Sequence, residues 1–358
     1  MPEFRSGLAS IPVYTPGKPI EEVARELGLE EIVKVASNEC PLPPFPEVQA
    51  AIAAAAADLN RYPETSCHAV VAALSTHYGL PSDHFWVGGG STQLLGGMAS
   101  AVGGPGTTAV FGEPSFVMYR IAALLAGSQP IAVPLDADFR HDLDAMADAV
   151  GPDTRIVFVC NPNNPTGTHV PADAVTRFVE RMPNHVLVVI DEAYAEYATA
   201  DDYATAIPQA LERDNVVVTR TFSKVYGLAG LRIGYALGHP DTLAMLRRTQ
   251  NPFAVTTLAQ VGAIESLRHP DRIEQRVKNN AAGREWLGAE LAERGVAVVP
   301  SQANFVFVVP DGDPAKITNR MLERGVIIRP MGPYLRISVG TETENERFIA
   351  AWDEVAAE

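Results

Sequence analysis

The sequence predicts an α/β protein whose main domain is a mostly parallel sheet sandwiched by helices, with a smaller α+β domain after it. Between about residues 45 and 240, short runs rich in Val and Ile alternate with helical patterns, as is typical of strands buried on both faces. After about residue 265 the pattern changes to one long helix followed by interleaved strands and helices. We therefore divide the chain into an N-terminal arm (1–45), a large domain (46–265) and a small C-terminal domain (266–358).

The elements of the large domain follow in order along the chain. Residues 46–59 and 65–79 have helical patterns, and Gly79 closes the second helix. A short strand at 85–87 precedes a helix that begins at Ser91 and Thr92. Further strands are predicted at 107–111, 130–135, 155–160, 185–190 and 215–219, and helical stretches such as 115–127 and 171–182 separate them.

The last strand of this domain, 232–237, is expected to be antiparallel. Only about eleven residues separate it from the strand at 215–219, whereas a parallel crossover usually needs a dozen or more. In the small domain we predict a long helix at 270–295 and strands at 297–300, 304–309, 326–330 and 335–340. Residues 1–45 are rich in Pro and Gly, which indicates an arm.

Composition limits the classes of partner. The chain has 358 residues, 47% of them hydrophobic and 20% charged, which suits a globular protein with a large core. A formal net charge of -15 argues against nucleic acid or an anionic membrane as the main partner. No segment reaches about 18 uninterrupted apolar residues and the N-terminus lacks an apolar signal region, so we expect a cytoplasmic protein. Three cysteines without CxxC spacing and eight histidines without H-x-x-x-H spacing predict no disulfide framework and no metal.

Polar side chains follow three of the predicted strands. Residues 161–167 (NPNNPTG), 191–194 (DEAY) and Lys224 each come just after an apolar run. Ligands of open α/β sheets gather at the carboxyl ends of strands, so these side chains are expected to converge on one rim.

Two nucleotide-binding interpretations of the sequence are discounted. The segment 186–193 (VLVVIDEA) could end in a magnesium-binding aspartate, but the chain lacks the G-x-x-x-x-G-K-[ST] loop that such a site needs. The glycines at 104–106 precede a strand, whereas a dinucleotide fingerprint follows a strand and opens a helix.

The segment 221–234 (TFSKVYGLAGLRIG) gathers two hydroxyls and two cations between two strands. Thr221, Ser223 and Arg232, with the helix N-terminus at Ser91 and Thr92, suit an anionic group, and phosphate is the commonest small one.

A lysine near an aspartate also suits Schiff-base chemistry, in which the amine must lose its proton before it attacks a carbonyl. Pyridoxal phosphate requires such a lysine, an acidic partner for its ring nitrogen and a phosphate cradle. Asp191 would keep the ring nitrogen protonated, and Asn164 and Tyr194 would hydrogen-bond the 3-oxygen of the ring.

Three ordered motifs resemble those of fold-type I pyridoxal-phosphate-dependent aminotransferases of the histidinol-phosphate and aromatic amino acid branch. They are NPNNPTG (161–167), IDEAY (190–194) and TFSKVYGLAGLRIGY (221–235). The resemblance runs almost end to end, through YTPGKPIEEVARELGL, VKVASNECPLPP, NRYPET, EPSFVMY, PSQANFVF and LRISVGTETEN. It implies the corresponding fold and pyridoxal 5'-phosphate as cofactor.

The resemblance also implies roles for single residues. Lys224 would form the aldimine and later move a proton at Cα, assisted by Asp191 and Tyr194. Phe116 would stack on the ring, where relatives often have tyrosine, although packing is an alternative role for it. Tyr62 would reach the partner subunit's cofactor phosphate, which implies a homodimer with shared sites. The implied substrate-binding residues are Tyr14, Asn38, Asn164, Arg329 and Arg336.

Two departures from the family pattern affect the expected site. The family commonly has GNGSDE where this chain reads GGGSTQ at 88–93, so Thr92 and Gln93 replace acidic residues. Cys40 stands where the family commonly has the second asparagine of SNENP. These changes bear on the substrate and on the phosphate hydrogen bonds.

The expected activity is a ping-pong transamination of aromatic amino acids (phenylalanine, tyrosine, tryptophan) with 2-oxoglutarate. Histidinol phosphate is the alternative donor, favoured by Arg329, whose guanidinium could bind a substrate phosphate. Decarboxylation of threonine phosphate and a non-enzymatic cofactor-binding module are the remaining alternatives.

Overall fold

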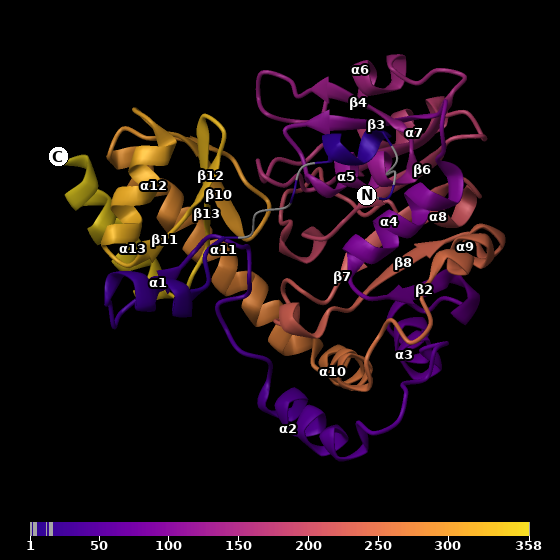
Figure 1. The fold of residues 1–358 in the computed structure, drawn as a ribbon, viewed down its shortest axis with the longest axis horizontal. Helices are drawn as coiled ribbons and strands as arrows, with labels where there is room; N and C mark the ends of the chain where they lie inside the picture. Colours follow the sequence, from indigo (N-terminus) through magenta and orange to yellow (C-terminus); the bar gives the residue numbers. More distant parts are fainter. Residues whose placement is uncertain (1, 3–5, 12, 14–16, 358) are drawn as a thin grey trace.

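The computed structural model describes residues 2, 6–11, 13 and 17–357. It has a large lobe built on one sheet and a smaller lobe that carries the C-terminal helices (Figure 1). Helix α11 (Pro270–Glu293) runs from the small lobe towards the base of the large one (Figure 1).

The large lobe contains a seven-stranded sheet in the order β2-β8-β7-β6-β5-β3-β4. The neighbours β6–β7, β5–β6, β3–β5 and β3–β4 are parallel, whereas β8 is antiparallel to both β7 and β2. The predicted α/β fold and its antiparallel strand are therefore confirmed. The strands are β2 (Phe85–Gly88), β3 (Thr108–Glu113), β4 (Gln129–Pro134), β5 (Thr154–Cys160), β6 (Leu187–Asp191), β7 (Val216–Thr221) and β8 (Gly234–Gly238).

Helices cover both faces of this sheet, because successive strand residues point to opposite sides and both sets are apolar. In β6, Leu187 and Val189 pack in one cluster with α4 (Ser91–Val102) and α5 (Met118–Ala126). Val188 and Ile190 pack in the other cluster, with α3 (His68–Tyr78), α7 (Ala172–Arg181) and α10 (Thr257–Leu267). The remaining helices of this part are α2 (Pro46–Ala55), α6 (Leu143–Asp148), α8 (Ile207–Glu212) and α9 (Pro240–Leu246).

The small lobe holds a four-stranded antiparallel sheet in the order β12-β13-β10-β9. Its elements are β9 (Ala297–Val299), β10 (Phe305–Val309), α12 (Pro314–Glu323), β12 (Arg329–Met331), β13 (Tyr334–Ser338) and α13 (Glu342–Ala356). The strand predicted at 326–330 is in fact two. Its first part, β11 (Val326–Ile327), pairs with β1 (Val33–Lys34), while β12 pairs with β13.

The described part of the N-terminal segment lies partly against the small lobe. Strand β1 runs parallel to β11, and Val23 of α1 (Ile20–Leu27) packs with Ala36 and Ile327. The division at residues 45 and 265 stays a prediction.

Short 3-10 helices complete the secondary structure of the described residues. The 3-10 helices are Ser6–Ser10, Ala56–Asp58, Ser82–His84, Ala195–Tyr197, Ala229–Leu231 and Arg247–Thr249. Within the described ranges, no helix has the length and apolarity to cross a membrane. The same ranges contain no group of three His, Cys, Asp or Glu side chains placed to hold a metal ion.

Candidate active site

A cavity of about 810 Å³ lies where the carboxyl ends of the parallel strands meet the small lobe's β12–β13 hairpin. Thirteen of the residues predicted for the site line it: Asn38, Ser91, Thr92, Phe116, Asn164, Asp191, Tyr194, Thr221, Ser223, Lys224, Arg232, Arg329 and Arg336. They come from both lobes, so the fold brings together residues far apart in sequence. Of the other two, Tyr14 lies outside the described residues and Tyr62 lies outside the cavity.

Lys224 is partly buried in the turn that follows β7. Its Nζ donates to the main-chain oxygen of Asn38 at 3.1 Å and lies 5.4 Å from the centre of the Tyr194 ring. Burial lowers the pKa of this amine from 10.5 to about 8, and the positive charge of Arg336 acts in the same direction. A usable fraction of the amine is therefore neutral, and nucleophilic, near neutral pH.

Asp191 is the last residue of β6 and is only 1% exposed. Each of its carboxylate oxygens accepts a hydrogen bond, one from the Tyr119 hydroxyl at 2.8 Å and one from Thr219 Oγ1 at 3.0 Å. Burial raises the pKa of Asp191, whereas the two hydrogen bonds lower it. The two donors also fix the orientation of the carboxylate in the cavity.

The sequence analysis missed Tyr119 and Thr219. Thr219 is the Cα partner of Asp191 across β6 and β7, so strand register was the signal that could have identified it. Tyr119 lies within the EPSFVMY motif but reads as an apolar core residue of a helix. Its ring stacks on Phe158 with centroids 4.8 Å apart and meets Phe116 edge-on at 5.7 Å.

Asn38 links the N-terminal segment to both lobes. Its side-chain nitrogen Nδ2 donates to the Tyr194 hydroxyl at 3.0 Å, and its Oδ1 accepts from the Ser338 hydroxyl at 3.1 Å. The backbone of Asn38 is left-handed, with φ of 53°, a conformation that asparagine tolerates better than most residues. Burial raises the pKa of Tyr194, so its phenol stays protonated.

Two arginines on neighbouring strands line the small-lobe side of the cavity. Arg336 of β13 donates to Asn164 Oδ1 at 2.5 Å and to the Ala36 carbonyl oxygen at 2.8 Å. Arg329 of β12 is its Cα partner and is also partly buried. This wall therefore favours an anionic group such as a carboxylate.

The opposite end of the cavity is built for a second anion. Arg232, itself at a φ of 56°, donates to Ser223 Oγ at 3.3 Å, and the Ser223 amide donates to Thr221 Oγ1 at 3.1 Å. Gly90 precedes the N-terminus of α4 with φ of 84°, and a Cβ there would lie 2.7 Å from Arg232 Nη2. Because only glycine permits this approach, the guanidinium and the helix N-terminus share one concave site.

Of the two departures from the expected pattern, the one at Thr92 and Gln93 lies beside this site and the one at Cys40 does not. The Gln93 side chain folds back to accept a hydrogen bond from the Gly89 amide, so it supports the loop before α4. Cys40 lines a separate cavity of about 580 Å³ between the 40–42 segment and helices α11 and α13.

The donor set fits pyridoxal phosphate. The Gly90 cradle with Arg232 suits the phosphate, the Asp191 carboxylate suits a protonated ring nitrogen, and the amine of Lys224 has a lowered pKa.

Comparison with known proteins agrees with this arrangement. Residues 30–351 match the family model for aminotransferase class I and II. A histidinol-phosphate aminotransferase of Moorella thermoacetica is 40% identical, with 100% of this chain and 94% of that protein covered. An aromatic amino acid aminotransferase of Streptomyces coelicolor is 41% identical, with 100% and 98% covered. The solved structure of histidinol-phosphate aminotransferase from Sinorhizobium meliloti in complex with pyridoxal-5'-phosphate superimposes with a TM-score of 0.92 at 31% identity, covering 100% of this chain and 98% of that one.

Proposed function

This chain belongs to the class I and II aminotransferases and uses pyridoxal phosphate, and we propose that it transfers the amino group of an aromatic amino acid to 2-oxoglutarate. The proposal concerns the donor and the acceptor. We further propose that the enzyme works in the cytoplasm as a homodimer.

The apolar wall of the cavity is the observation that supports an aromatic amino acid as the donor. The wall is formed by α5, by the residues just before it and by the β12–β13 hairpin, and its side chains are Phe116, Val117, Ile121, Met331 and Tyr334. The Tyr334 ring is held edge-on by Phe139, with centroids 5.4 Å apart. Such a wall suits a planar apolar ring.

Arg120 also lines this cavity, and its charge is paired with that of Glu113. Its Nη2 lies 2.6 Å from a Glu113 carboxylate oxygen, so the pair offers little attraction to a phosphate dianion. This supports a donor without a phosphate.

The chain's own groups divide the chemistry between them. Pyridoxal phosphate, when bound, supplies an electron sink for the pair released from the Cα–H bond of the donor. Lys224 Nζ takes the proton from that Cα, and Arg336 binds the α-carboxylate through its N–H fork. Asp191 holds a proton at the ring nitrogen. Because Asn164 Oδ1 accepts from Arg336, the side-chain amide nitrogen of Asn164 is the group that would donate to the 3-oxygen of a bound cofactor.

Histidinol phosphate is the second candidate donor. Arg329 is partly buried in the cavity wall and could bind a substrate phosphate. Relatives such as those of Moorella thermoacetica and Nitrosospira multiformis carry the name histidinol-phosphate aminotransferase.

The homodimer is supported by Tyr62. Its side chain is 81% exposed and stacks on Phe253, which is 43% exposed, with ring centroids 4.5 Å apart. A large exposed aromatic pair suits a protein interface, and we propose that Tyr62 reaches the cofactor phosphate in the second copy.

The first half-reaction tests the donor directly. Holoenzyme without a 2-oxo acid is mixed with L-phenylalanine or L-histidinol phosphate, and the change in cofactor absorbance is followed. We expect faster conversion by phenylalanine at low concentration, with little effect of Arg329→Met on that rate. Faster conversion by histidinol phosphate, reduced by Arg329→Met, would contradict the aromatic proposal and favour the second candidate.

A further inference from the structure

The carboxyl ends of β6 and β7 carry polar side chains on both faces of the sheet. Asp191 follows Leu187 and Val189 in strand period, so it lies on the face covered by α4 and α5. The next residue, Glu192, therefore lies on the opposite face. Arg220 lies there too, because it follows Val216 and Val218, which belong to the cluster on that face.

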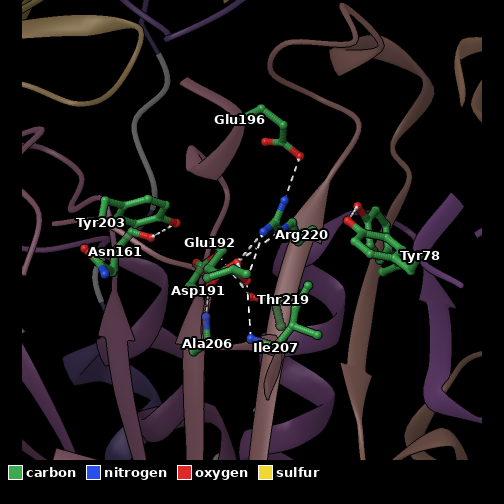
Figure 2. A network of polar contacts seen from close by, with 12 residues as sticks. Tyr78, Asn161, Asp191, Glu192, Glu196, Tyr203, Ala206, Ile207, Thr219 and Arg220 are labelled. Carbon is green, nitrogen blue, oxygen red and sulfur yellow. Dashed lines mark hydrogen bonds and ion pairs between the residues drawn. The ribbon is translucent and has the colours of Figure 1, made fainter. Parts of the chain in front are cut away.

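Glu192 and Arg220 form a buried ion pair behind the cofactor cavity. Arg220 donates to Glu192 Oε2 through Nη2 at 2.6 Å and through Nε at 3.0 Å, and its Nη1 donates to Glu196 at 3.4 Å. Figure 2 shows Arg220 between the two carboxylates. The side chains are 1% exposed for Glu192 and 11% for Arg220, so water screens the pair little.

The rest of the pair's hydrogen-bonding capacity is met by the segment before α8. The Ala206 amide donates to Glu192 Oε1 at 2.6 Å, and the Thr205 hydroxyl donates to Glu192 Oε2 at 2.7 Å. Arg220 Nη2 also donates to Thr205 Oγ1 at 3.1 Å. Both carboxylate oxygens of Glu192 are thus held in place (Figure 2).

A buried ion pair is a poor means of adding stability, because desolvation offsets its attraction and an apolar pair of similar volume would serve as well. It does impose a single geometry, since every polar contact must be kept to avoid leaving a buried charge unpaired.

The ion pair is one residue away from the Asp191 contacts on each strand, because Glu192 follows Asp191 and Arg220 follows Thr219. The Glu192 amide donates to the Thr219 carbonyl oxygen at 2.9 Å, and Thr219 Oγ1 donates to Asp191 at 3.0 Å. We propose that the Glu192–Arg220 ion pair is a positioning pair that sets, from behind the sheet, the placement of Asp191 and Thr219 against the cofactor. The inference rests on the cofactor chemistry of the proposed function and adds two residues that do not line the cavity.

The test uses Glu192→Gln, which keeps the shape of the side chain but removes its charge, and Arg220→Met, which keeps an unbranched stem but removes the guanidinium. Apoenzyme is titrated with pyridoxal phosphate to obtain Kd, and holoenzyme carrying ring-¹⁵N cofactor is examined by NMR for protonation of the ring nitrogen. We expect Kd to rise at least about tenfold and the ¹⁵N signal to move towards unprotonated pyridine in both variants.

Arg213→Met is the matched control. Arg213 donates to the Met182 carbonyl oxygen at 3.1 Å and to Asn215 Oδ1 at 3.3 Å, near the amino ends of the same strands. We expect a lower Tm for this variant with a wild-type Kd and ¹⁵N signal.

Three other outcomes are informative. Arg220→Met and Glu192→Gln with lower Tm but wild-type Kd and ¹⁵N signal would overturn the positioning role. If Arg220→Met does not fold, Arg220→Lys keeps the charge but loses the two-nitrogen contact, and a wild-type Kd and signal there would overturn it equally. Wild-type apoenzyme that fails to bind pyridoxal phosphate would instead refute the proposed function.

Discussion

At Lys224, burial and neighbouring positive charge act in the same direction on one amine. They lower its pKa from 10.5 to about 8, with Arg336 the largest charge contribution to that decrease. We predict that apoenzyme takes up pyridoxal phosphate at a rate that rises with pH through a midpoint near 8. Stopped-flow absorbance measures this rate. In Arg336→Met the midpoint should move upwards, because one repulsive charge is removed.

The same shift affects stability in a defined direction. Between pH 8 and 10.5 the Lys224 amine is protonated in the unfolded chain and neutral in the folded chain, so folding releases a proton. The unfavourable contribution of Lys224 to stability is therefore full below pH 8 and declines as pH rises to 10.5.

Lys224→Ala should abolish the absorbance change of cofactor uptake at every pH. An uptake midpoint near 10.5 in the wild type would contradict the assigned environment.

Tyr119 is the residue outside the predicted set that touches Asp191 most directly. Tyr119→Phe removes the 2.8 Å hydrogen bond to Asp191, which raises the pKa of that carboxyl further above its usual value. A hydrogen bond to a charged group contributes about 1.5–3 kcal/mol, so we predict roughly a tenfold or greater loss of pyridoxal-phosphate affinity. Titration of apoenzyme measures the change.

Tyr78→Phe is the control for this prediction. It also removes a tyrosine hydroxyl, on a partly buried side chain whose described partner is the Tyr235 hydroxyl at 2.7 Å. Cofactor affinity near the wild-type value is expected for it. Equal losses in the two variants would show that Tyr119 acts through general packing.

At the scale of elements, the junction between β2 and α4 depends on glycine. Gly90→Ala would place a Cβ 2.7 Å from Arg232 Nη2, whereas Gly106, with nearly the same φ (85° against 84°), has no neighbour within 4 Å. We predict that both alanine variants lose about 1 kcal/mol or more in urea unfolding through backbone strain. Only Gly90→Ala should also weaken the binding of pyridoxal phosphate. The same variant should weaken the inhibition of that binding by inorganic phosphate.

Equal cofactor affinity in the two glycine variants would mean that Arg232 and the helix N-terminus do not act together. The contrast is sharp because the two positions have nearly the same positive φ but differ in what lies beside them.

Element boundaries show where local patterns stop being informative. The helix predicted at 46–59 ends as α2 at Ala55 and continues as a 3-10 turn, although the alanines that follow favour helix. The strand predicted at 232–237 begins at Gly234, because Arg232 adopts a left-handed φ of 56°. The run 326–330 looks like one strand but is divided between two partners, β1 and β13.

At the scale of the whole molecule, the homodimer can be tested by complementation. Chains carrying Lys224→Ala and Tyr62→Ala are co-expressed, and mixed dimers are isolated by two different tags. If Tyr62 completes the second copy's site, one site per mixed dimer has both residues intact. We predict wild-type cofactor affinity at that site and up to half the wild-type activity per dimer.

Sedimentation should give the mass of two 38.4 kDa chains for the wild type. A monomer, or mixed dimers no better than Tyr62→Ala alone, would contradict shared sites.

The polar residues at strand ends could be predicted because each strand's buried run and the turn after it are local in sequence. Asp191 follows the run in β6 directly, and Lys224 lies three residues after the end of β7. Strand order then places them on one rim, as a parallel sheet requires.

Contacts between residues far apart in the chain could not be predicted in this way. Asn38 and Tyr194 are 156 residues apart, and Arg336 and Asn164 are 172 apart, yet each pair is hydrogen-bonded. Motif resemblance named these residues but did not place them against each other.

From the sequence alone came the fold class, the antiparallel strand and the chemistry of the rim, because apolar periodicity and turn residues act over a few positions. Tertiary structure alone decided that Tyr119 and Thr219 hold Asp191, that Arg336 lowers the pKa of Lys224, and that Glu192 pairs with Arg220. Hydrogen bonds and pKa shifts depend on distance and burial, and these are set only when the helices and strands have packed together.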